Sequence, residues 1–365
     1  MRHWSTRLAL TALCIALATG AYAQVTPAAG YTPPDDTRKF NIGATIFADY
    51  TYQDSPKITD ADKNSVNFSQ FQVTRAYINV TGQLNHLIFF RITPDVSRET
   101  SATATLSGSQ LFRLKYAYGQ FNLDDWTTHG SWIRFGVQQT PYVDYTEGIY
   151  RYRFQGTIFP ERAGFISSAD AGLSAHWNFP NNYGDLHAGF YNGENYNKAE
   201  VNDQKAFQIR GTLRPLPLGG VLKGLRLTAF LIEDHFVKSD KRERAIGQIT
   251  FESAPINVGA DYLETKDRAS SAVAQVDAKG WDVWAVPKLG TTGWELLLRH
   301  DDLKPNKNAT QKQKRNIAGI AYWFKNLAPG VSTAILFDYD SLERTGVTPA
   351  VPKTTNYEIK TLINF

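Results

Sequence analysis

Cysteine is nearly absent from this sequence, and the single cysteine, Cys14, lies in an apolar run near the N-terminus. After that run no apolar stretch approaches the roughly 20 residues that a membrane-spanning helix needs. No block of lysine and arginine occurs either, and the formal charge of +4 is nearly balanced over 365 residues. These absences argue against a disulfide-stapled fold, a helical membrane protein and a nucleic-acid-binding protein.

The first 23 residues have the pattern of a secretory signal peptide. Arg2 and Arg7 precede the apolar run 8–18, and Ala21-Tyr22-Ala23 supplies the small residues of a cleavage site. A leader rich in proline follows over 24–39 and is expected to be flexible. We therefore expect an exported chain that must be stabilised by packing or by closure of its strands, because it has no disulfide.

The last ten residues form a segment with one apolar and one polar face. Tyr357, Ile359, Ile363 and Phe365 share the apolar face, and Leu362 interrupts the polar one. This period of two is the signature of a strand. A terminal aromatic residue on the apolar face is typical of the last strand of a bacterial outer-membrane barrel, because aromatic rings favour the headgroup boundary.

The clearest strand runs from 40 to 53, with Phe47 as the only apolar residue on its polar face. It is longer than the 9–11 or so residues that a tilted strand needs to cross a bilayer. Similar alternating segments follow to the C-terminus. The expected strands are 40–53, 75–82, 87–93, 111–122, 131–139, 169–179, 185–191, 205–213, 225–233, 244–252, 256–264, 280–287, 293–301, 315–325, 331–340 and 355–365.

The connections between these strands are expected to differ in length. Short turns carry proline, glycine or asparagine, whereas longer connections such as 54–67, 96–110 and 302–314 are hydrophilic. Short turns at one end and long loops at the other are typical of outer-membrane barrels. We therefore predict an all-β fold, a closed antiparallel transmembrane β-barrel of about 16 strands over 40–365. A soluble, secreted β-sandwich or β-rich enzyme is the alternative.

One long connection, 140–165, is aromatic rather than merely polar. Such a segment is costly to leave in water, so we expect it to pack in the lumen, which a barrel of this strand number leaves open, and to narrow the channel. The alternative is that it folds over the barrel mouth or into a subunit contact. The residues expected at the constriction are Tyr145, Glu147, Arg151, Arg153, Glu161 and Arg162.

Several stretches resemble the phosphate-selective porin O and P family of bacterial outer-membrane porins. Residues 75–82 (RAYINVTG) match an early strand that ends in glycine, and 136–142 (GVQQTPY) match the segment that enters the inserted loop. Glu147 and 160–162 (PER) fall where that loop carries acidic and Glu-Arg positions. Residues 189–193 (GFYNG) match a strand that ends in Asn-Gly.

The resemblance implies a sixteen-stranded, trimeric porin whose third external loop folds inward and which prefers anions such as phosphate. The sequence departs from the family at Gln139, where the family usually has lysine. That difference bears on phosphate selectivity more than on pore formation.

Charged residues opposite the apolar face of each strand are expected to point into the channel. A lysine or arginine facing lipid near the midplane costs about 2–4 kcal/mol, so parity decides the direction. The cations expected to line the pore and set its selectivity are Arg75, Arg91, Arg113, Lys115, Arg134, Arg210, Arg226, Arg244 and Arg299. The same parity turns Lys360, Asp49, Glu295, Asp301, Asp338 and Glu358 inward. Cationic rings favour anions, whereas arginines paired with carboxylates would only stiffen the wall.

The function expected from these features is a porin in the bacterial outer membrane, a passive diffusion channel for small hydrophilic solutes with an anion preference. Its partners are then outer-membrane lipid, the solutes and two further copies in a homotrimer. Two alternatives remain: a barrel with a blocked lumen that acts as an adhesin or structural protein, and an outer-membrane lipid hydrolase built on Ser174, His176 and His187. Without a Gly-x-Ser-x-Gly or His-Glu-x-x-His motif, catalysis is disfavoured. No metal site or cofactor is expected.

Overall fold

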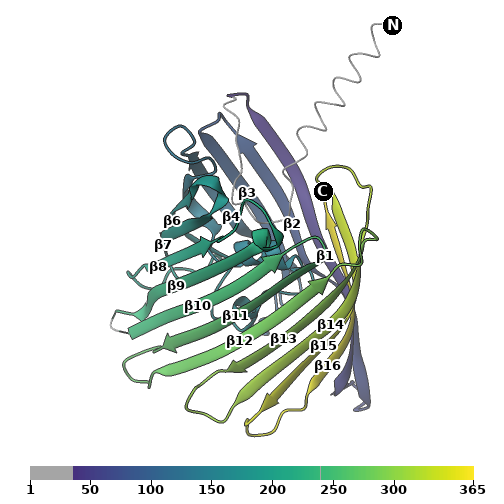
Figure 1. The fold of residues 1–365 in the computed structure, drawn as a ribbon. Coiled ribbons are helices and arrows are strands. Elements are labelled where there is room, and N and C mark those ends of the chain that lie inside the picture. The colour runs from purple at the N-terminus through teal and green to yellow at the C-terminus, as the bar shows by residue number, and fades with distance from the viewer. Residues whose placement is uncertain (1–35, 239) are drawn as a thin grey trace.

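The computed structural model describes residues 36–238 and 240–365 as a single closed ring of antiparallel strands (Figure 1). Each strand pairs with its two neighbours in sequence, and the ring is completed between the first and the last. The predicted signal peptide and most of the predicted leader lie outside the described residues. The strands are β1 (Lys39–Thr59), β2 (Ser65–Gln83), β3 (Ile88–Arg98), β4 (Gln110–Asn122), β5 (Trp132–Gln139), β6 (Ala169–Asn178), β7 (Gly184–Tyr191), β8 (Ala206–Leu213), β9 (Leu225–Val237), β10 (Asp240–Glu252), β11 (Ile256–Asp267), β12 (Val276–Pro287), β13 (Trp294–Lys304), β14 (Lys312–Trp323), β15 (Ser332–Thr345) and β16 (Thr354–Asn364).

Closure of the ring depends on the C-terminal strand. β16 pairs with β1 from Thr45 opposite Asn364 to Ser55 opposite Thr355. The backbones of Ala44 and Phe365 complete the seam with two hydrogen bonds of 2.8 and 3.0 Å. The closed antiparallel barrel and its strand number are thus confirmed, and the alternative of a β-sandwich is wrong.

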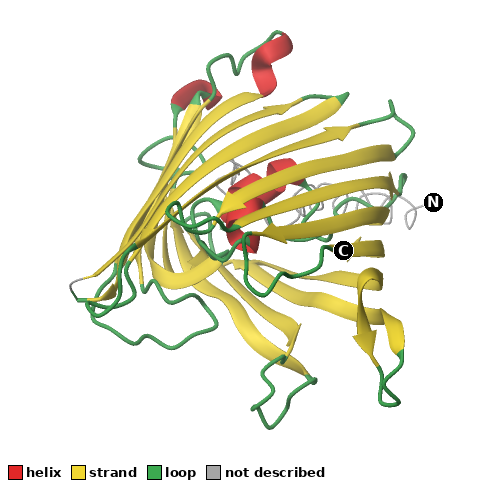
Figure 2. Ribbon diagram, turned by 90° about the horizontal axis from the view of Figure 1, so that it is seen from below, coloured by secondary structure: helices red, strands yellow, loops and turns green. Residues whose placement is uncertain are grey.

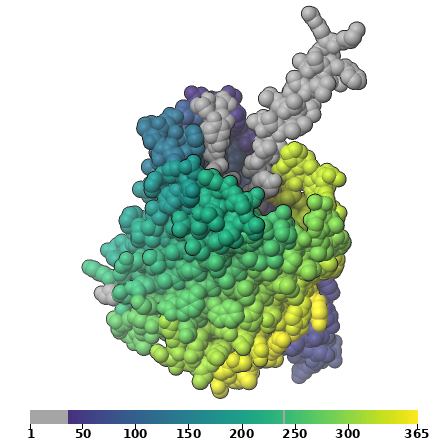
Figure 3. Space-filling model, in the orientation of Figure 1, coloured from purple at the N-terminus to yellow at the C-terminus, as the bar shows by residue number. Residues whose placement is uncertain are grey.

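The outer face of the ring is apolar. Ile42, Phe71 and Phe135 are 78, 82 and 73% exposed, although no soluble fold would leave so many large apolar side chains in water. Figure 3 shows the outer wall from teal to yellow as one continuous surface. A continuous apolar outer band on a closed barrel is the arrangement that lipid requires.

The inner face carries the polar residues and, in addition, a second group of apolar side chains. Phe47 and Leu362, the two exceptions to the alternating pattern, pair with each other across β1 and β16 and are both buried. They point inward because their position in the pleat turns them away from lipid. The interior therefore has a hydrophobic core of its own.

Two predicted connections are wrong in length. β1 continues to Thr59 and β2 begins at Ser65, so the predicted loop 54–67 is mostly a hairpin of paired strands. β9 ends at Val237 and β10 begins at Asp240, so both strands extend beyond the expected 225–233 and 244–252 and shorten the connection between them. The polar composition misled because strands that project beyond the membrane can be polar on both faces while their backbone groups remain paired. None of the helices among the described residues is long and apolar enough to cross a bilayer.

Because the outer band faces lipid, the free-energy cost of a charged substitution on it should depend on the depth of that residue in the bilayer. Phe337 on β15 is half exposed between Ile320 and Ile359 of the neighbouring strands. We expect Phe337→Arg to lower the free energy of unfolding in bilayers by about 2–4 kcal/mol, because the arginine then faces hydrocarbon. Titration with urea or guanidinium in lipid vesicles measures this change.

Asn316→Arg provides the matched control, because Asn316 is also exposed on the outside but lies near the loop end of β14. It should cost no more than about 1 kcal/mol. Equal effects of the two substitutions would contradict the assignment of the outer band to lipid.

Candidate functional site

The segment between β5 and β6 lies inside the ring of strands, where Figure 2 shows its two short helices enclosed by the barrel. The helices are α2 (Val143–Tyr150) and α3 (Phe159–Arg162). α2 ends where Arg151 takes a left-handed conformation (φ 67°) and its N–H bonds to the carbonyl of Glu147. We refer to residues 140–168 as the inner segment.

Hydrogen bonds tie the inner segment to the wall over many strands. Tyr142 donates to Asp261 on β11 (2.9 Å), and Tyr152 donates to Glu295 on β13 (2.8 Å). Gln155 donates to Asp338 on β15 (3.0 Å). Because the partners lie on three different strands, β11, β13 and β15, the segment cannot swing away without breaking several buried contacts at once.

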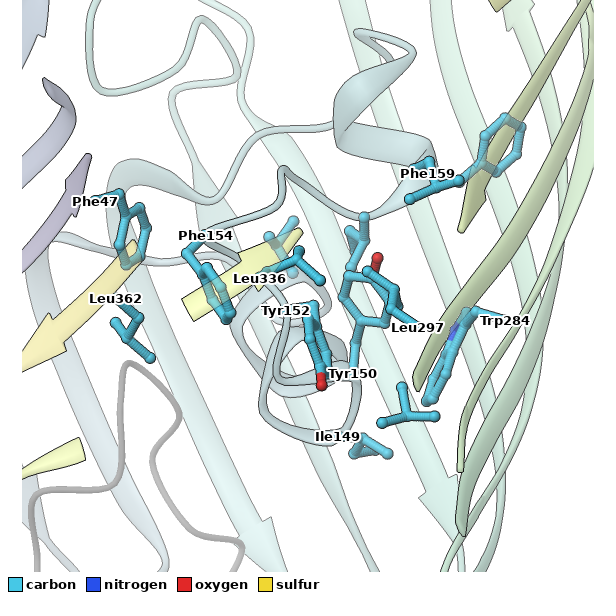
Figure 4. Close-up of a cluster of buried hydrophobic side chains, with 14 of the residues drawn as sticks. Phe47, Ile149, Tyr150, Tyr152, Phe154, Phe159, Trp284, Leu297, Leu336 and Leu362 are labelled. Atoms are coloured by element: carbon cyan, nitrogen blue, oxygen red, sulfur yellow. The ribbon is translucent and has the colours of Figure 1, made fainter. Parts of the chain in front are cut away.

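Aromatic side chains of the segment fill the inner hydrophobic core (Figure 4). Phe154 lies against Phe47 on β1 and against Trp323 on β14, with ring centroids 6.5 and 5.9 Å apart. Tyr150 contacts Trp284 on β12 edge-on at 5.2 Å. The inward apolar residues thus form the surface against which the segment packs.

Three of the predicted constriction residues contact the wall. Tyr145 lies under the guanidinium of Arg210, 3.9 Å from ring centre to Cζ. Arg151 pairs with Glu295 at 3.0 Å and lies over Trp323. Arg162 donates to the Gln155 side chain and to a backbone carbonyl, and lies 3.6 Å from Asp340.

The other three, Glu147, Arg153 and Glu161, form a cluster on the segment itself. The Arg153 guanidinium lies 3.0 Å from Glu147 and 3.8 Å from Glu161. Burial raises the pKa of Glu147 to about 8, even though Arg153 opposes the shift. Burial likewise raises the pKa of nearby Asp144 to about 6, and Tyr116 donates a hydrogen bond to that carboxyl.

All nine predicted pore-lining cations are on the face of their strands opposite the exposed apolar residues, but they fall into two groups. The first group lies on β2–β5. Arg75 and Arg113 share one carboxylate, Asp95, at 2.9 and 3.0 Å. Arg91 donates to the neutral side chains of Asn79 and Thr93.

Lys115 and Arg134 complete this first group. Lys115 is almost completely buried, donates to the Tyr77 hydroxyl at 3.4 Å and lies over the Tyr77 ring. Arg134 donates to Gln120 and to Gln139, and stacks over Trp132. Gln139, where the family usually has lysine, accepts a hydrogen bond from the Arg134 guanidinium at 3.1 Å.

The second group lies on β8–β13, and each member has a carboxylate partner of its own. The pairs are Arg210 with Asp185, Arg226 with Glu252, Arg244 with Asp267 and Arg299 with Asp301. Three of these arginines also donate to backbone carbonyls of the inner segment, namely those of Pro141, Phe165 and Thr157. Their contacts are those of residues that hold the segment in place.

Asp95 is the inward-facing carboxylate partner of two predicted pore-lining arginines, and the sequence analysis did not name it. It lies two residues beyond the expected strand 87–93, and bulges in β2 and β4 accompany the approach of Arg75 and Arg113 to the same oxygen. The only signal in the sequence was its position two residues after inward-facing Thr93, which places both side chains on the same face of the strand.

A family model for the phosphate-selective porin O and P proteins matches residues 40–286, which is more than half of the chain. The chain belongs to this family. No curated protein matches the porin.

Solved structures with the same fold include other outer-membrane channels. The porin is similar to OmpF of Salmonella typhi in complex with daunomycin (12% identity, 90% of this chain and 98% of that one, TM-score 0.60). It is also similar to the trimer form of OmpT of Vibrio cholerae (11%, 90% and 100%, TM-score 0.57) and to the channel DcaP of Acinetobacter baumannii (12%, 92% and 100%, TM-score 0.54). The family and the fold together make the protein a non-enzymatic porin channel of the outer membrane.

The residues of the rejected hydrolase alternative do meet on the inner wall of the porin. Ser174 lies 3.2 Å from His187, but its hydroxyl donates to Gln138 at 2.6 Å. The carboxylate Asp185 is bonded to the other histidine, His176, and to Arg210. No histidine here links the serine to an aspartate, which a catalytic triad needs. Among residues 36–238 and 240–365, no group of His, Cys, Asp and Glu could hold a metal ion.

The raised pKa of Glu147 predicts a change of stability with pH. Between about pH 4.5 and 8 the unfolded chain has ionised this carboxyl while the folded porin keeps it protonated, so the free energy of unfolding falls as pH rises through that range. Glu147→Gln should flatten the slope, which for one group is at most about 1.4 kcal/mol per pH unit. Denaturant titrations at several pH values measure it.

Glu343→Gln is the matched control, because Glu343 is exposed at the end of β15 and should leave the slope unchanged. An unchanged slope in Glu147→Gln would refute the protonated state of this side chain.

Proposed function

We propose that the porin is a passive diffusion channel for small hydrophilic solutes in which anions are favoured over cations. The observation that supports this preference is the excess of cations on the β2–β4 wall. Arg75, Arg91, Arg113 and Lys115 lie there, and Asp95 is the one carboxylate within ion-pair distance of them in the described part of the chain. Cationic side chains along a passage lower the barrier for anions.

The inner segment supports the same preference for anions at neutral pH. Glu147 is the acidic group nearest to Arg153, and its pKa of about 8 keeps it largely protonated at pH 7. The charge of Arg153 is then balanced less completely than the formal charges imply. Asp144, whose pKa of about 6 leaves it mostly ionised at pH 7, is the carboxylate of the segment that acts on the cations of the β2–β4 wall.

The inner segment is proposed to set the size limit of the channel. Its aromatic residues occupy the interior and its hydrogen bonds hold it on the wall, so solutes must pass through the space that remains beside it. A segment that closed the lumen completely would make the protein an adhesin or structural barrel instead.

The porin is further proposed to act as a homotrimer in outer-membrane lipid. The trimer form of the OmpT structure and the family resemblance support this assembly.

Planar-bilayer recording of the purified porin tests the function directly. We expect discrete conductance steps and, in a KCl gradient, a reversal potential with the sign of an anion-selective channel. Arg91→Gln should shift that potential toward cation selectivity, because it removes a charge that has no carboxylate within ion-pair distance among the described residues. Arg226→Gln is the matched control, because it removes an arginine already paired with Glu252 near the turn end of β9, and should shift it less.

A cation-selective wild-type channel would refute the anion preference while leaving the pore intact. The absence of any conductance steps from folded protein would refute the pore.

The size limit is tested by loosening the inner segment. Phe154→Ala removes a ring that lies between Phe47 and Trp323, at an expected cost of about 3–5 kcal/mol in stability. Because the segment is then less firmly held, single-channel conductance should rise and fluctuate more.

Phe190→Ala serves as the matched control, since Phe190 is a lipid-facing ring that is 60% exposed. It should leave conductance unchanged. If Phe154→Ala also left conductance unchanged, the inner segment would not limit the passage.

A further inference from the structure

A separate pocket of about 180 Å³ lies between the inner segment, strands β8–β10 and the connection that follows β7. Gly193, Asn195 and Lys198 of the long connection after β7 are among the residues that line it. We call it the mouth pocket. Its apolar side is formed by Phe165, Ile166, Ile232 and Phe236. Of the predicted pore-lining and constriction residues, only Arg244 lines this pocket.

Gln208 is the feature of the mouth pocket that points to a ligand. It lies on β8 between Gly189 and Ile232 of the neighbouring strands, and its side chain lines the pocket while only 5% of the residue is exposed. Its Oε1 atom has no hydrogen-bond partner in the described part of the chain. Leaving a buried amide unpaired is costly, and rotation about its last side-chain bond presents either end of the amide to a bound solute.

The charges around the pocket are balanced except at two places. Arg242 pairs with Asp234, and Arg244 pairs with Asp267. Asp170, which is 97% buried, accepts only the backbone N–H groups of Ala171 and Gly193, at 2.8 and 2.7 Å, and no cation lies within ion-pair distance of it in the described residues.

Lys198 is the second unbalanced charge. It lies on the connection after β7, is exposed at the rim of the pocket, and forms no ion pair with any described residue. A buried negative charge with an exposed positive charge at the rim, joined by an apolar side, is complementary to a solute that carries both signs.

We propose that the mouth pocket binds a small zwitterion, a free α-amino acid with an apolar side chain, before it passes the inner segment. The ammonium group is held by Asp170 and Gln208, the carboxylate by Lys198, and the side chain lies against Phe165 and Phe236. The proposal deepens the proposed channel function and rests on it for transport, although binding itself does not require conduction. A simple anion would be repelled by Asp170, and a simple cation would be repelled by Lys198. A solute with both charges therefore fits better than either.

The test uses the full-length porin in detergent with L-leucine as the probe, and measures binding by ligand-observed NMR. Leucine amide, which lacks the carboxylate, and 4-methylpentanoate, which lacks the ammonium group, are the matched ligands, and D-glucose represents neutral solutes. We expect leucine to bind more tightly than all three. Gln208→Leu should weaken leucine binding about tenfold, because the apolar side chain cannot meet the ammonium group.

Lys198→Gln gives a second variant that cannot disturb the fold through burial. It should weaken leucine binding up to about fivefold and leave leucine amide unchanged. Lys353→Gln is the matched control, because Lys353 is also an exposed lysine on a connection, but on the one before β16. It should change neither ligand.

Three results would overturn the proposal: no leucine binding, equal binding of leucine and glucose, or equal loss of leucine and leucine amide in Lys198→Gln. Single-channel recording of the same preparations separates this from the proposed function. Conductance steps without leucine binding refute the mouth pocket alone, whereas folded protein that gives no steps refutes the channel.

Discussion

Closure of the strand ring is the constraint on which the rest of this porin depends. In hydrocarbon an unpaired backbone group has no water to bond to, so an open sheet edge is excluded. The pairing of β1 with β16, down to the bonds between Ala44 and Phe365, removes both edges at once. Only after this closure do the two faces of each strand acquire different surroundings, lipid outside and the enclosed interior inside.

The interior of the barrel is stabilised in the manner of a soluble protein. The inner segment brings tyrosines and phenylalanines into contact with inward-facing apolar residues of the wall, and its polar groups bond to wall carboxylates. Because the contacts reach from β1 to β15, the segment braces the barrel across its diameter. The same contacts that hold the segment determine how much of the lumen remains for solutes.

Charge is distributed unevenly around this braced interior. The arginines of β8–β13 each have a carboxylate, and three of them also bond to the inner segment. Among the cations of β2–β4, Arg75 and Arg113 share a single carboxylate, Asp95, whereas Arg91 and Lys115 bond to neutral side chains. A count of charges along the chain cannot separate these groups, because partners are chosen across strands. Arg75 and Asp95 are on different strands, and β2 has a bulge directly before Arg75.

The alternation along each strand determined the fold class, the strand number, the inward direction of the cations and the terminal strand of the seam, because the period of two is a local property that a lipid–water boundary enforces residue by residue. The alternation also marked Phe47 and Leu362 as apolar residues on the polar face. Only the tertiary structure shows why they are apolar, because there they form part of the surface against which Phe154 packs. Tertiary structure alone likewise decided the length of the β1–β2 connection, the pairing of Asp95 and the unpaired amide of Gln208. These features depend on strand register and on docking of the inner segment, which are contacts between residues far apart in the chain.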